Sequence, residues 1–497
     1  PREREIYLHT ELKNDRGIHL DRELVVAARA IADEGIARAN AALDEITDGQ
    51  VTGVTKTGPM RAWLKDQGVD APSIAKAPLR ELLESDLDPK VRMVLEHRQE
   101  SGKSSVAKLD SMLDVVCDDG QLRGLTMYHG ASTGRESGRL CQPHNYPQGD
   151  IPNIEEYIDP VLRQEYDEID ITYHPVRVIV SMLRAMLSSR PGHELIAADF
   201  SAIEARVLVV LAGQDDIVEL WRSGQDVYKY NAARLYGVPV DQVTKQQRQT
   251  GKFQELGAGY GMGAKKAVSA GKAVYQLELS EENAREIING YRTTHSKVVA
   301  FWNESDRAAL HAVANPGVVF SFGGGKPHAG EHEIRWSGSR WMWVEKREGI
   351  YQGNSGPLKF IKAGAYLYLI LPSKRPLVYA APRIVEAETP WGELKPGVEI
   401  SSVSGYTHQW ERQRMYGGLW VENIVQAVSR DLLKEADLRV EQHGYPVVLD
   451  VHDEVVAEVP EGFGSVEEFE KLLAVTPEWA AGWPIKAEGW RGTRYRK

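Results

Sequence analysis

Two aspartates at the ends of short apolar stretches constrain the fold of this chain more than any other feature. Asp199 ends the stretch 194–199, which is typical of a buried strand, and Asp453 lies in a turn between two apolar strands within 446–459. They are 453 − 199 = 254 positions apart, so only the fold can bring them together. A carboxylate at the end of a buried strand is costly unless it is paired or metal-bound. Together the two can hold a pair of Mg²⁺ ions and support an in-line displacement at phosphorus. The alternative is that each is a solvated acid.

The stretch Arg248-x-x-x-Lys252-x-x-x-Leu256-x-x-x-Tyr260-Gly261 is a second candidate for chemistry. Positions four apart lie along one face of a helix, and two cations followed by an aromatic residue suit a triphosphate and a base. Helix propensity opposes this, because glycine occupies position 251 and every second position from 257 to 263. Propensity alone therefore predicts a glycine-rich loop. The stretch lacks the Gly-Lys-Ser/Thr ending of a P-loop, so a solvated, mobile basic turn is the other interpretation.

The charge balance gives only indirect support for a nucleic-acid partner. The net charge is 60 − 71 = −11, which taken alone argues against one. Residues 241–275 nevertheless hold six cations and two acids, a local +4. The six are Lys245, Arg248, Lys252, Lys265, Lys266 and Lys272, and the two acids are Asp241 and Glu255. A basic channel on an acidic body is compatible with this distribution.

Composition limits the class of protein. The 497 residues are enough for several domains, and 42% hydrophobic with 26% charged residues is typical of globular proteins. No apolar run reaches about 18 residues, so a membrane span is not expected, and the charged first residues do not resemble a secretory signal. Cys117 and Cys141 are too few for a disulfide framework or a zinc site.

Hydrophobic periodicity and turn residues predict the other elements. We expect helices over 23–46, 78–99, 203–236, 281–314 and 421–442, a polar helix start or turn at 101–108, an extended loop over 129–153, and β hairpins over 317–410.

Three of these segments resemble motifs of the family A DNA polymerases, the group that includes bacterial DNA polymerase I. The segment 199–206, Asp-Phe-Ser-Ala-Ile-Glu-Ala-Arg, resembles motif A. The segment 248–261 is similar to motif B, with Arg, Lys and Tyr-Gly in register, and Val451-His-Asp-Glu454 resembles motif C.

Three further matches extend the resemblance to nearly the whole chain. Thr133-Gly-Arg135, followed by Gln142-Pro-His-Asn145-Tyr-Pro147, resembles the family's Thr-Gly-Arg…Asn-x-Pro segment, and Gln426 matches another position of the family. The segment 14–21 resembles the start of the family's thumb. The five blocks between 133 and 454 occur in the family's order.

The resemblance implies an α+β right-hand polymerase fold, with an antiparallel-sheet palm, helical fingers and a helical thumb. It divides the chain into a thumb with the start of the palm (1–118), a palm segment with motif A (119–206), fingers with motif B (207–315), a β-rich insertion in the fingers or palm (316–410) and a palm segment with motif C (411–497). It also implies a monomer in the cytoplasm of a bacterium or a phage-infected host cell. Its partners would be primer–template DNA and dNTPs.

The resemblance implies a role for each motif residue. Asp199 and Asp453, aided by the main-chain carbonyl of Phe200, would bind two Mg²⁺ ions, for which Mn²⁺ can substitute. Arg248 and Lys252 would bind the incoming triphosphate, and Lys252 would also protonate the leaving group. Glu454 would lie near the metals without being an obligatory ligand.

Selection of the nucleotide would fall to three other positions. Tyr260 is expected against the templating base. Glu204 is expected to act as a steric gate where a ribose 2′-hydroxyl would fall; the alternative is an exposed helix acid. Leu256 departs from the best-known members, which carry Phe or Tyr beside the nucleotide sugar. This departure puts discrimination among sugars, including dideoxynucleotides, in doubt.

DNA contacts are implied on two parts of the chain. Arg135, Asn145, Gln426 and His452 are expected at the primer–template end. Contact from the minor groove would let correct pairing be checked without reading sequence, because its acceptors are similar on all base pairs. Lys103, Ser104, Ser105 and Lys108 resemble thumb residues that hold duplex phosphates.

Two further expectations concern the type of polymerase. Residues 317–410 fit the bacterial pattern poorly, and 371–375 and 416–423 resemble phage-encoded members, so a phage or prophage origin is expected. A proofreading exonuclease domain would precede the thumb with its own metal-binding acids. Since thumb-like helices begin near residue 1, no 3′→5′ exonuclease is expected in this chain.

Three alternatives remain open from the sequence. A single-subunit phage-type RNA polymerase shares the order of these motifs, although Glu204 and Glu454 favour DNA synthesis. A non-catalytic DNA-binding scaffold would be expected to have lost Asp199, Lys252 or Asp453. A metal-dependent nuclease also uses paired aspartates. It does not need the residues spaced four apart in motif B, from Arg248 to Tyr260, which are called the stripe below.

Overall fold

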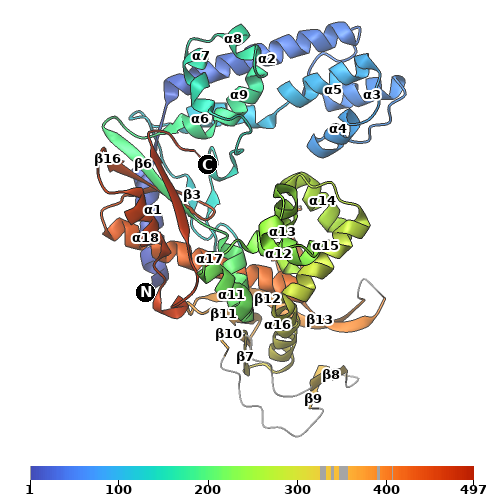
Figure 1. Ribbon diagram of the computed structural model, residues 1–497, viewed down its shortest axis with the longest axis vertical. Helices are drawn as coiled ribbons and strands as arrows, with labels where there is room; N and C mark the ends of the chain where they lie inside the picture. Colours follow the sequence, from blue (N-terminus) through green and yellow to red (C-terminus); the bar gives the residue numbers. More distant parts are fainter. Residues whose placement is uncertain are drawn as a thin grey trace.

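The computed structural model describes residues 2–324, 332–336, 341–345, 356–388, 392–405 and 407–496. Its architecture is α+β with antiparallel sheets, as expected. Figure 1 shows a helical N-terminal part at the top, a sheet at the left, a second group of helices at the right and a β-rich part below. Among the described residues, no helix is both long and apolar enough to cross a bilayer.

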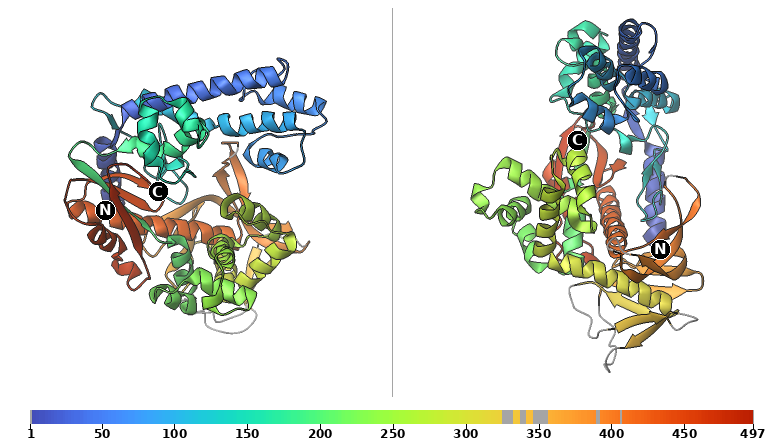
Figure 2. Two further views of the ribbon diagram at one scale, coloured as in Figure 1. Left: turned by 45° about the horizontal axis from the view of Figure 1, so that its top comes forward. Right: turned by 90° about the vertical axis from the view of Figure 1, so that its right-hand side faces the viewer.

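Helices dominate the N-terminal part. They are α1 (Arg2–Arg16), α2 (Arg22–Ile46), α3 (Thr57–Asp66), α4 (Lys76–Leu83), α5 (Pro89–Ser101) and α6 (Ala107–Val115). The longest, α2, begins where Asp21 accepts a hydrogen bond from the Leu24 amide at 2.9 Å, and its apolar residues recur at helical spacing. Helix α1 instead lies beside α17 (Gly417–Gln442), as the right-hand view of Figure 2 shows.

Three short helices that follow the first strands also belong with α2. They are α7 (Ile158–Leu162), α8 (Tyr166–Asp170) and α9 (Pro175–Met182). Both α7 and α9 pack on α2, and the approach is so close that a Cβ at Gly35 would lie 2.8 Å from the Val176 side chain. The domain boundary at 118 therefore cuts through one packed group of helices. The expected 129–153 loop contains only short elements, among them β4 (Ser137–Gly138).

The central sheet has the strand order β15-β16-β6-β17, and each neighbouring pair is antiparallel. Its strands are β15 (Val447–Val451), β16 (Glu454–Pro460), β6 (His193–Phe200) and β17 (Ala487–Gly492). Every residue of β15, and all of β16 except its last, is buried. Helix α18 (Val466–Ala474) packs on β6 and β17 and also against α17. A sheet covered on both faces explains why these strands are continuous apolar runs in the sequence.

Seven α-helices lie between β6 and β7 (Val319–Phe322) in the described chain: α10 (Ile203–Ala212), α11 (Asp215–Arg222), α12 (Val227–Tyr236), α13 (Lys245–Gly257), α14 (Ala264–Tyr275), α15 (Glu281–Thr294) and α16 (Ser296–Ala314). The prediction of a glycine-rich loop from propensity is wrong for α13. Thr244 and Gln247 form a reciprocal capping box that starts this helix. At Gly251 the helix approaches α12 so closely that a Cβ would overlap the carbonyl oxygen of Tyr228.

The β-rich part confirms the hairpins predicted for 317–410 where the structure describes them. A six-stranded antiparallel sheet has the order β14-β13-β12-β11-β10-β7. Its strands are β7 (Val319–Phe322), β10 (Leu358–Ala363), β11 (Tyr366–Ile370), β12 (Pro376–Glu388), β13 (Leu394–Val403) and β14 (Trp410–Arg414). One face packs on α16. Strands β8 (His332–Trp336) and β9 (Trp341–Glu345) form a separate pair, and residues 325–331, 337–340 and 346–355 lie outside the described residues.

Candidate active site

The fold brings Asp199 and Asp453 to the same end of neighbouring strands. In the register of β6 and β16, Asp199 lies opposite Glu454, the residue after Asp453. The Phe200 amide donates a hydrogen bond to the main-chain oxygen of Asp453 at 3.0 Å. Both aspartates are half-buried. Between β15 and β16 the chain turns through only His452 and Asp453, with His452 in the left-handed region at φ 60°. The two carboxylates that are 254 positions apart in sequence thus share one edge of the central sheet.

The third carboxylate, Glu454, has a different environment. Its side chain is buried, and it accepts hydrogen bonds from the Tyr495 hydroxyl at 2.6 Å and from the Trp490 indole at 3.3 Å. Burial, with Glu454 alongside, raises the pKa of Tyr495, so the phenol stays a donor. Glu454 thus lies next to Asp453 with its carboxylate hydrogen-bonded inside the protein.

The donor set at this edge suits a hard divalent cation. Carboxylate and carbonyl oxygens are the ligands that Mg²⁺ uses in proteins. Across the described part of the chain, no group of three or more His, Cys, Asp and Glu side chains is placed to hold a metal ion. A site here would therefore consist of two carboxylates completed by main-chain oxygen, water or substrate, which is the open arrangement that Mg²⁺ has beside phosphates.

Helix α13 presents the stripe of motif B. Arg248, Lys252, Leu256 and Tyr260 are all half-exposed, whereas Gly251 and 253–255 between them are buried. The Arg248 guanidinium donates to the Asp226 carboxylate at 2.7 Å and lies 5.1 Å from the centre of the Tyr228 ring. Within the described residues, the Lys252 side chain makes no hydrogen bond or ion pair.

Three residues from separate sequence blocks meet at Glu204. One carboxylate oxygen of Glu204 accepts a hydrogen bond from Arg135, and the other accepts from the Tyr260 hydroxyl at 2.8 Å. Burial and the nearby Glu204 carboxylate raise the pKa of Tyr260 well above its ordinary value, which keeps its hydroxyl protonated. The structure thus joins the Thr-Gly-Arg block, motif A and motif B through one carboxylate.

Gln426 lies one helical turn from an acid that the sequence analysis missed. On α17 its side-chain amide donates to Glu422 at 3.4 Å. Burial raises the pKa of Glu422, and Lys266 and Arg135 only partly oppose this. The i, i+4 spacing from Gln426 was the available signal in the sequence. Asp226, the partner of Arg248, was also missed, and nothing in its spacing points to it.

The other expected DNA-binding residues lie in two groups. His452 donates a hydrogen bond to the main-chain oxygen of His144 at 3.1 Å, so it lies against the block that holds Asn145. Lys108 and Asn145 both donate to the side-chain oxygen of Gln142, at 3.1 and 3.3 Å. Lys103 and Ser104 lie where a 3₁₀ turn leads into α6, and burial lowers the pKa of Lys103.

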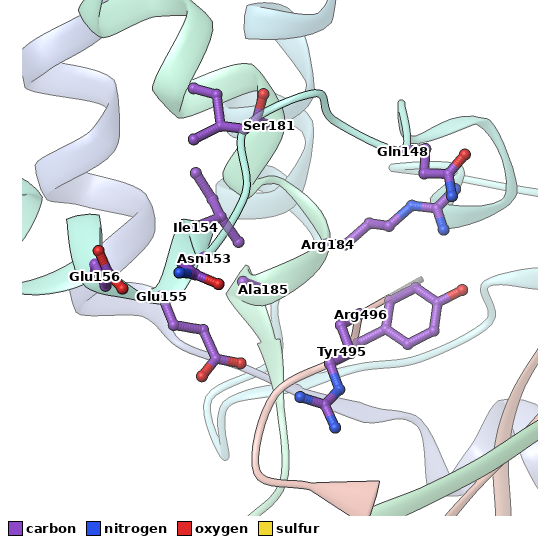
Figure 3. A pocket seen from close by; sticks show the side chains of 11 residues that line it. Gln148, Asn153, Ile154, Glu155, Glu156, Ser181, Arg184, Ala185, Tyr495 and Arg496 are labelled. Carbon is purple, nitrogen blue, oxygen red and sulfur yellow. The ribbon is translucent and has the colours of Figure 1, made fainter. Parts of the chain in front are cut away.

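Figure 3 shows a pocket of about 520 Å³. It is lined by residues of 148–156 and 181–185 together with Tyr495 and Arg496. Its link to the aspartates is Tyr495, whose hydroxyl donates to Glu454. None of the lining residues belongs to α13, so the pocket is not part of the stripe.

Comparisons with known proteins agree with this geometry. The family model for DNA polymerase family A matches residues 56–315. The DNA polymerase of Bacillus phage SP02 is 33% identical over 488 residues, which are 97% of this chain and 69% of that protein. DNA polymerase I of Pseudomonas aeruginosa is 28% identical over 232 residues, which are 46% of this chain and 22% of that protein. The match to a phage enzyme over nearly the whole chain supports the phage type.

A solved structure shows the same fold. It is the POL domain of Pol1 from M. smegmatis, in complex with DNA primer-template and dNTP. The superposition has a TM-score of 0.60 at 18% identity and covers 99% of this chain and 69% of that one. The right-hand polymerase fold expected from the motifs is thereby confirmed. This chain belongs to DNA polymerase family A and is a DNA-directed DNA polymerase of the phage type.

Proposed function

We propose that this chain adds dNTPs to a primer 3′-hydroxyl on a DNA template and releases pyrophosphate, with two divalent metal ions held by Asp199 and Asp453. The observation that carries the proposal is the register of β6 and β16 with the hydrogen bond from the Phe200 amide to Asp453. It places two half-buried carboxylates at one sheet edge. The M. smegmatis relative was solved with primer-template and dNTP, which supports the same substrates here.

Each residue has a definite part in this reaction. Bound at this edge, with the Phe200 carbonyl as a further ligand, divalent ions would make the primer hydroxyl more acidic and offset the charge on the leaving pyrophosphate. Arg248 and Lys252 bind the triphosphate from α13. Lys252 is the donor that protonates the departing pyrophosphate. Asp226 holds the Arg248 guanidinium in place.

Selection of the nucleotide depends on the group around Glu204. Its carboxylate stands where a ribose 2′-hydroxyl would fall, and Leu256 lies along the same stripe beside the sugar. Tyr260, held by Glu204, faces the templating base. Arg135, Gln426, His452 and Asn145 contact the primer–template end, and Lys103, Ser104 and Lys108 hold duplex phosphates.

The parts of the right hand follow from these roles. We assign the palm to the central sheet with α17 and α18, the fingers to α10–α16, and the thumb to α2–α6. The protein acts as a monomer on primer–template DNA. The expectation that this chain has no 3′→5′ exonuclease stays a prediction. Loss of a mismatched 3′ nucleotide in Mg²⁺ without dNTPs or pyrophosphate, persisting in Asp199→Ala, would contradict it.

The test is extension of a labelled primer on a DNA template in Mg²⁺, with dNTPs or with rNTPs. We compare the wild type with Asp199→Asn and Asp453→Asn. The control Glu461→Gln removes an exposed charge beyond the far end of β16. Templated dNTP addition that is lost in both aspartate variants and kept in the control supports the proposal.

Other outcomes separate the alternatives. Preferential use of rNTPs would indicate an RNA polymerase. Degradation of DNA without incorporation would indicate a nuclease. Tight binding of primer–template by folded protein, with no extension, would indicate a scaffold. Extension at the wild-type rate in Asp453→Asn would overturn the assignment of the metal ligands.

A further inference from the structure

Arg375 reaches from the β-rich sheet into the palm. It ends the tight turn 371–375 between β11 and β12, and Lys374 of this turn has φ 70°. The Arg375 side chain is only 4% exposed. Its Nε donates to the Asp431 carboxylate at 2.7 Å. One terminal nitrogen, Nη2, donates to the main-chain oxygens of Thr133 and Ala427, both at 3.0 Å.

The two carbonyls bonded to Arg375 adjoin residues proposed to contact DNA. Thr133 lies two residues before Arg135, and Ala427 follows Gln426. A single guanidinium therefore ties the Thr133–Arg135 loop to α17 next to Gln426. Packing is close, because a Cβ at Gly134, which has φ 87°, would overlap the other terminal nitrogen of Arg375.

The far side of the same loop is also held by buried charges. Glu136, the residue after Arg135, accepts from Lys13 at 2.7 Å, from Thr10 at 2.5 Å, and pairs with Lys434 at 3.0 Å. Both lysines also pair with buried Asp450 on β15. Glu136 therefore anchors one end of the loop, and the Arg375 contacts hold the Thr133 end.

Arginine is suited to this position in a way that lysine is not. Its planar guanidinium supplies several donors in fixed directions, so it can bond one carboxylate and two carbonyls at once. Asp431 needs the charge as well, since an unpaired buried carboxylate is strongly destabilising. Arg430 and Ser373 also contact Asp431, so the carboxylate keeps partners when Arg375 is replaced conservatively.

We propose that Arg375 is a positioning residue for primer extension: it holds the main chain at Thr133 and Ala427 so that Arg135 and Gln426 face the primer terminus. The proposal rests on the proposed roles of Arg135 and Gln426. Through Arg375, the β-rich sheet would affect how well the primer terminus is held for extension, although this sheet does not carry the aspartates. Small displacements of a substrate-positioning group reduce rates strongly.

The test compares Arg375→Lys with Arg383→Lys. Arg383 lies on β12, the strand that follows Arg375; its side chain is exposed and pairs with Glu399, so its replacement controls for loss of a nearby arginine. We expect Arg375→Lys to slow single-turnover extension by about tenfold, with the KM for dNTP nearly unchanged, and Arg383→Lys to have no effect. Amide hydrogen exchange of a 128–137 peptide should rise only in Arg375→Lys. Arg375→Gln with Asp431→Asn repeats the test without leaving an unpaired carboxylate at position 431.

A variant cycle with Arg135→Ala and Gln426→Ala combined separates positioning from general loss of stability. If Arg375 acts through these two residues, Arg375→Lys should slow the enzyme that lacks both by less than about twofold. Full multiplication of the two effects, or unchanged exchange of the loop, would overturn the proposal. If Arg135→Ala alone extends primers at the wild-type rate, the proposed role of Arg135 is wrong, and the loop exchange still decides whether Arg375 holds the loop.

Discussion

The carboxylate of Glu204 is held in place by contacts with two other motif residues. It accepts hydrogen bonds from Arg135 and Tyr260, and both its carboxylate oxygens are thereby used within the protein. Its side chain is 32% exposed, so it is half-covered rather than a solvated helix acid. A carboxylate fixed from two sides is held in place, as its proposed role as steric gate requires.

Replacing Glu204 should therefore change sugar selection. We expect Glu204→Ala to reduce the preference for dATP over ATP, as a ratio of kcat/KM values, by roughly 10- to 100-fold, because space opens where the 2′-hydroxyl would fall. Glu204→Gln keeps the volume and an acceptor for Tyr260, so it should keep most of the preference. Steady-state incorporation opposite a template thymine measures both. An unchanged ratio in Glu204→Ala would remove the steric role.

Asp306 on α16 provides a prediction about pH. Burial of its carboxyl raises its pKa from 3.8 to about 6. The folded protein then binds a proton more tightly than the unfolded chain, so stability falls as the pH rises through 4 to 6 and the penalty is complete above 6. Asp306→Asn should thus increase the free energy of unfolding at pH 7.5, by up to about 3 kcal/mol.

The gain from Asp306→Asn should shrink as the pH is lowered. Urea unfolding at pH 7.5 and at pH 4.5 measures it, and Asp70→Asn, at an exposed loop position, serves as the control with little change at either pH. An equal gain at both pH values would mean that ionisation of Asp306 is not the cause.

At the scale of elements, α13 depends on a close crossing with α12. Alanine is favoured over glycine in a helix by about 0.5–1 kcal/mol, but a Cβ at Gly251 would overlap the Tyr228 carbonyl. Because neither backbone can yield cheaply, we expect Gly251→Ala to destabilise the protein by about 1–3 kcal/mol. Gly58→Ala on α3, where a Cβ meets nothing within 4 Å, should be neutral or slightly stabilising. Urea denaturation measures the free energy of unfolding of both variants. If Gly251→Ala were more stable than the wild type, the close contact between α12 and α13 would be contradicted.

The same helix shows where sequence reasoning succeeds and fails. The strands around Asp199 and Asp453 could be predicted, because a sheet buried on both faces requires continuous apolar runs. Propensity failed at α13, since it counts Gly251 as a cost and cannot see the helix that the glycine allows to approach. The hairpins of 317–410 could be predicted by type, but their order could not, because strand order depends on contacts between distant segments.

Contacts between side chains on different elements could not be predicted from the sequence for a similar reason. Asp226 supports Arg248 from the position just before α12, and Arg375 reaches Thr133 from 242 positions away. Motif residues could be named because they keep a fixed spacing along the chain. Their partners could not, because what relates them is distance in the folded molecule.

At the scale of the whole molecule, an ion pair between described residues joins the proposed thumb to the proposed fingers. Lys272 of α14 donates to Glu84, just after α4, at 2.8 Å, and the two helices face each other at the right of Figure 1. Lys272 lowers the pKa of Glu84, and Glu84 raises that of Lys272. The Glu84 side chain is 45% exposed and that of Lys272 is 32% exposed, so solvent reaches the pair. Exposed pairs are weak and are screened by salt, so this contact can open and close.

Exchange of the charges of Lys272 and Glu84 tests whether this ion pair holds the proposed thumb and fingers together. Labels at Ser85→Cys and Ser269→Cys, both exposed positions, in a Cys117→Ser background report the separation by energy transfer. We expect Lys272→Glu and Glu84→Lys each to lower the transfer, because like charges then face each other, and the double exchange to restore it. Lys265→Glu, on the same helix, should leave it unchanged. In the wild type, transfer should fall as salt approaches 1 M, where the screening length is about 3 Å. If the double exchange restores nothing, or if salt has no effect, the approach of thumb and fingers has another cause, and this ion pair only accompanies it.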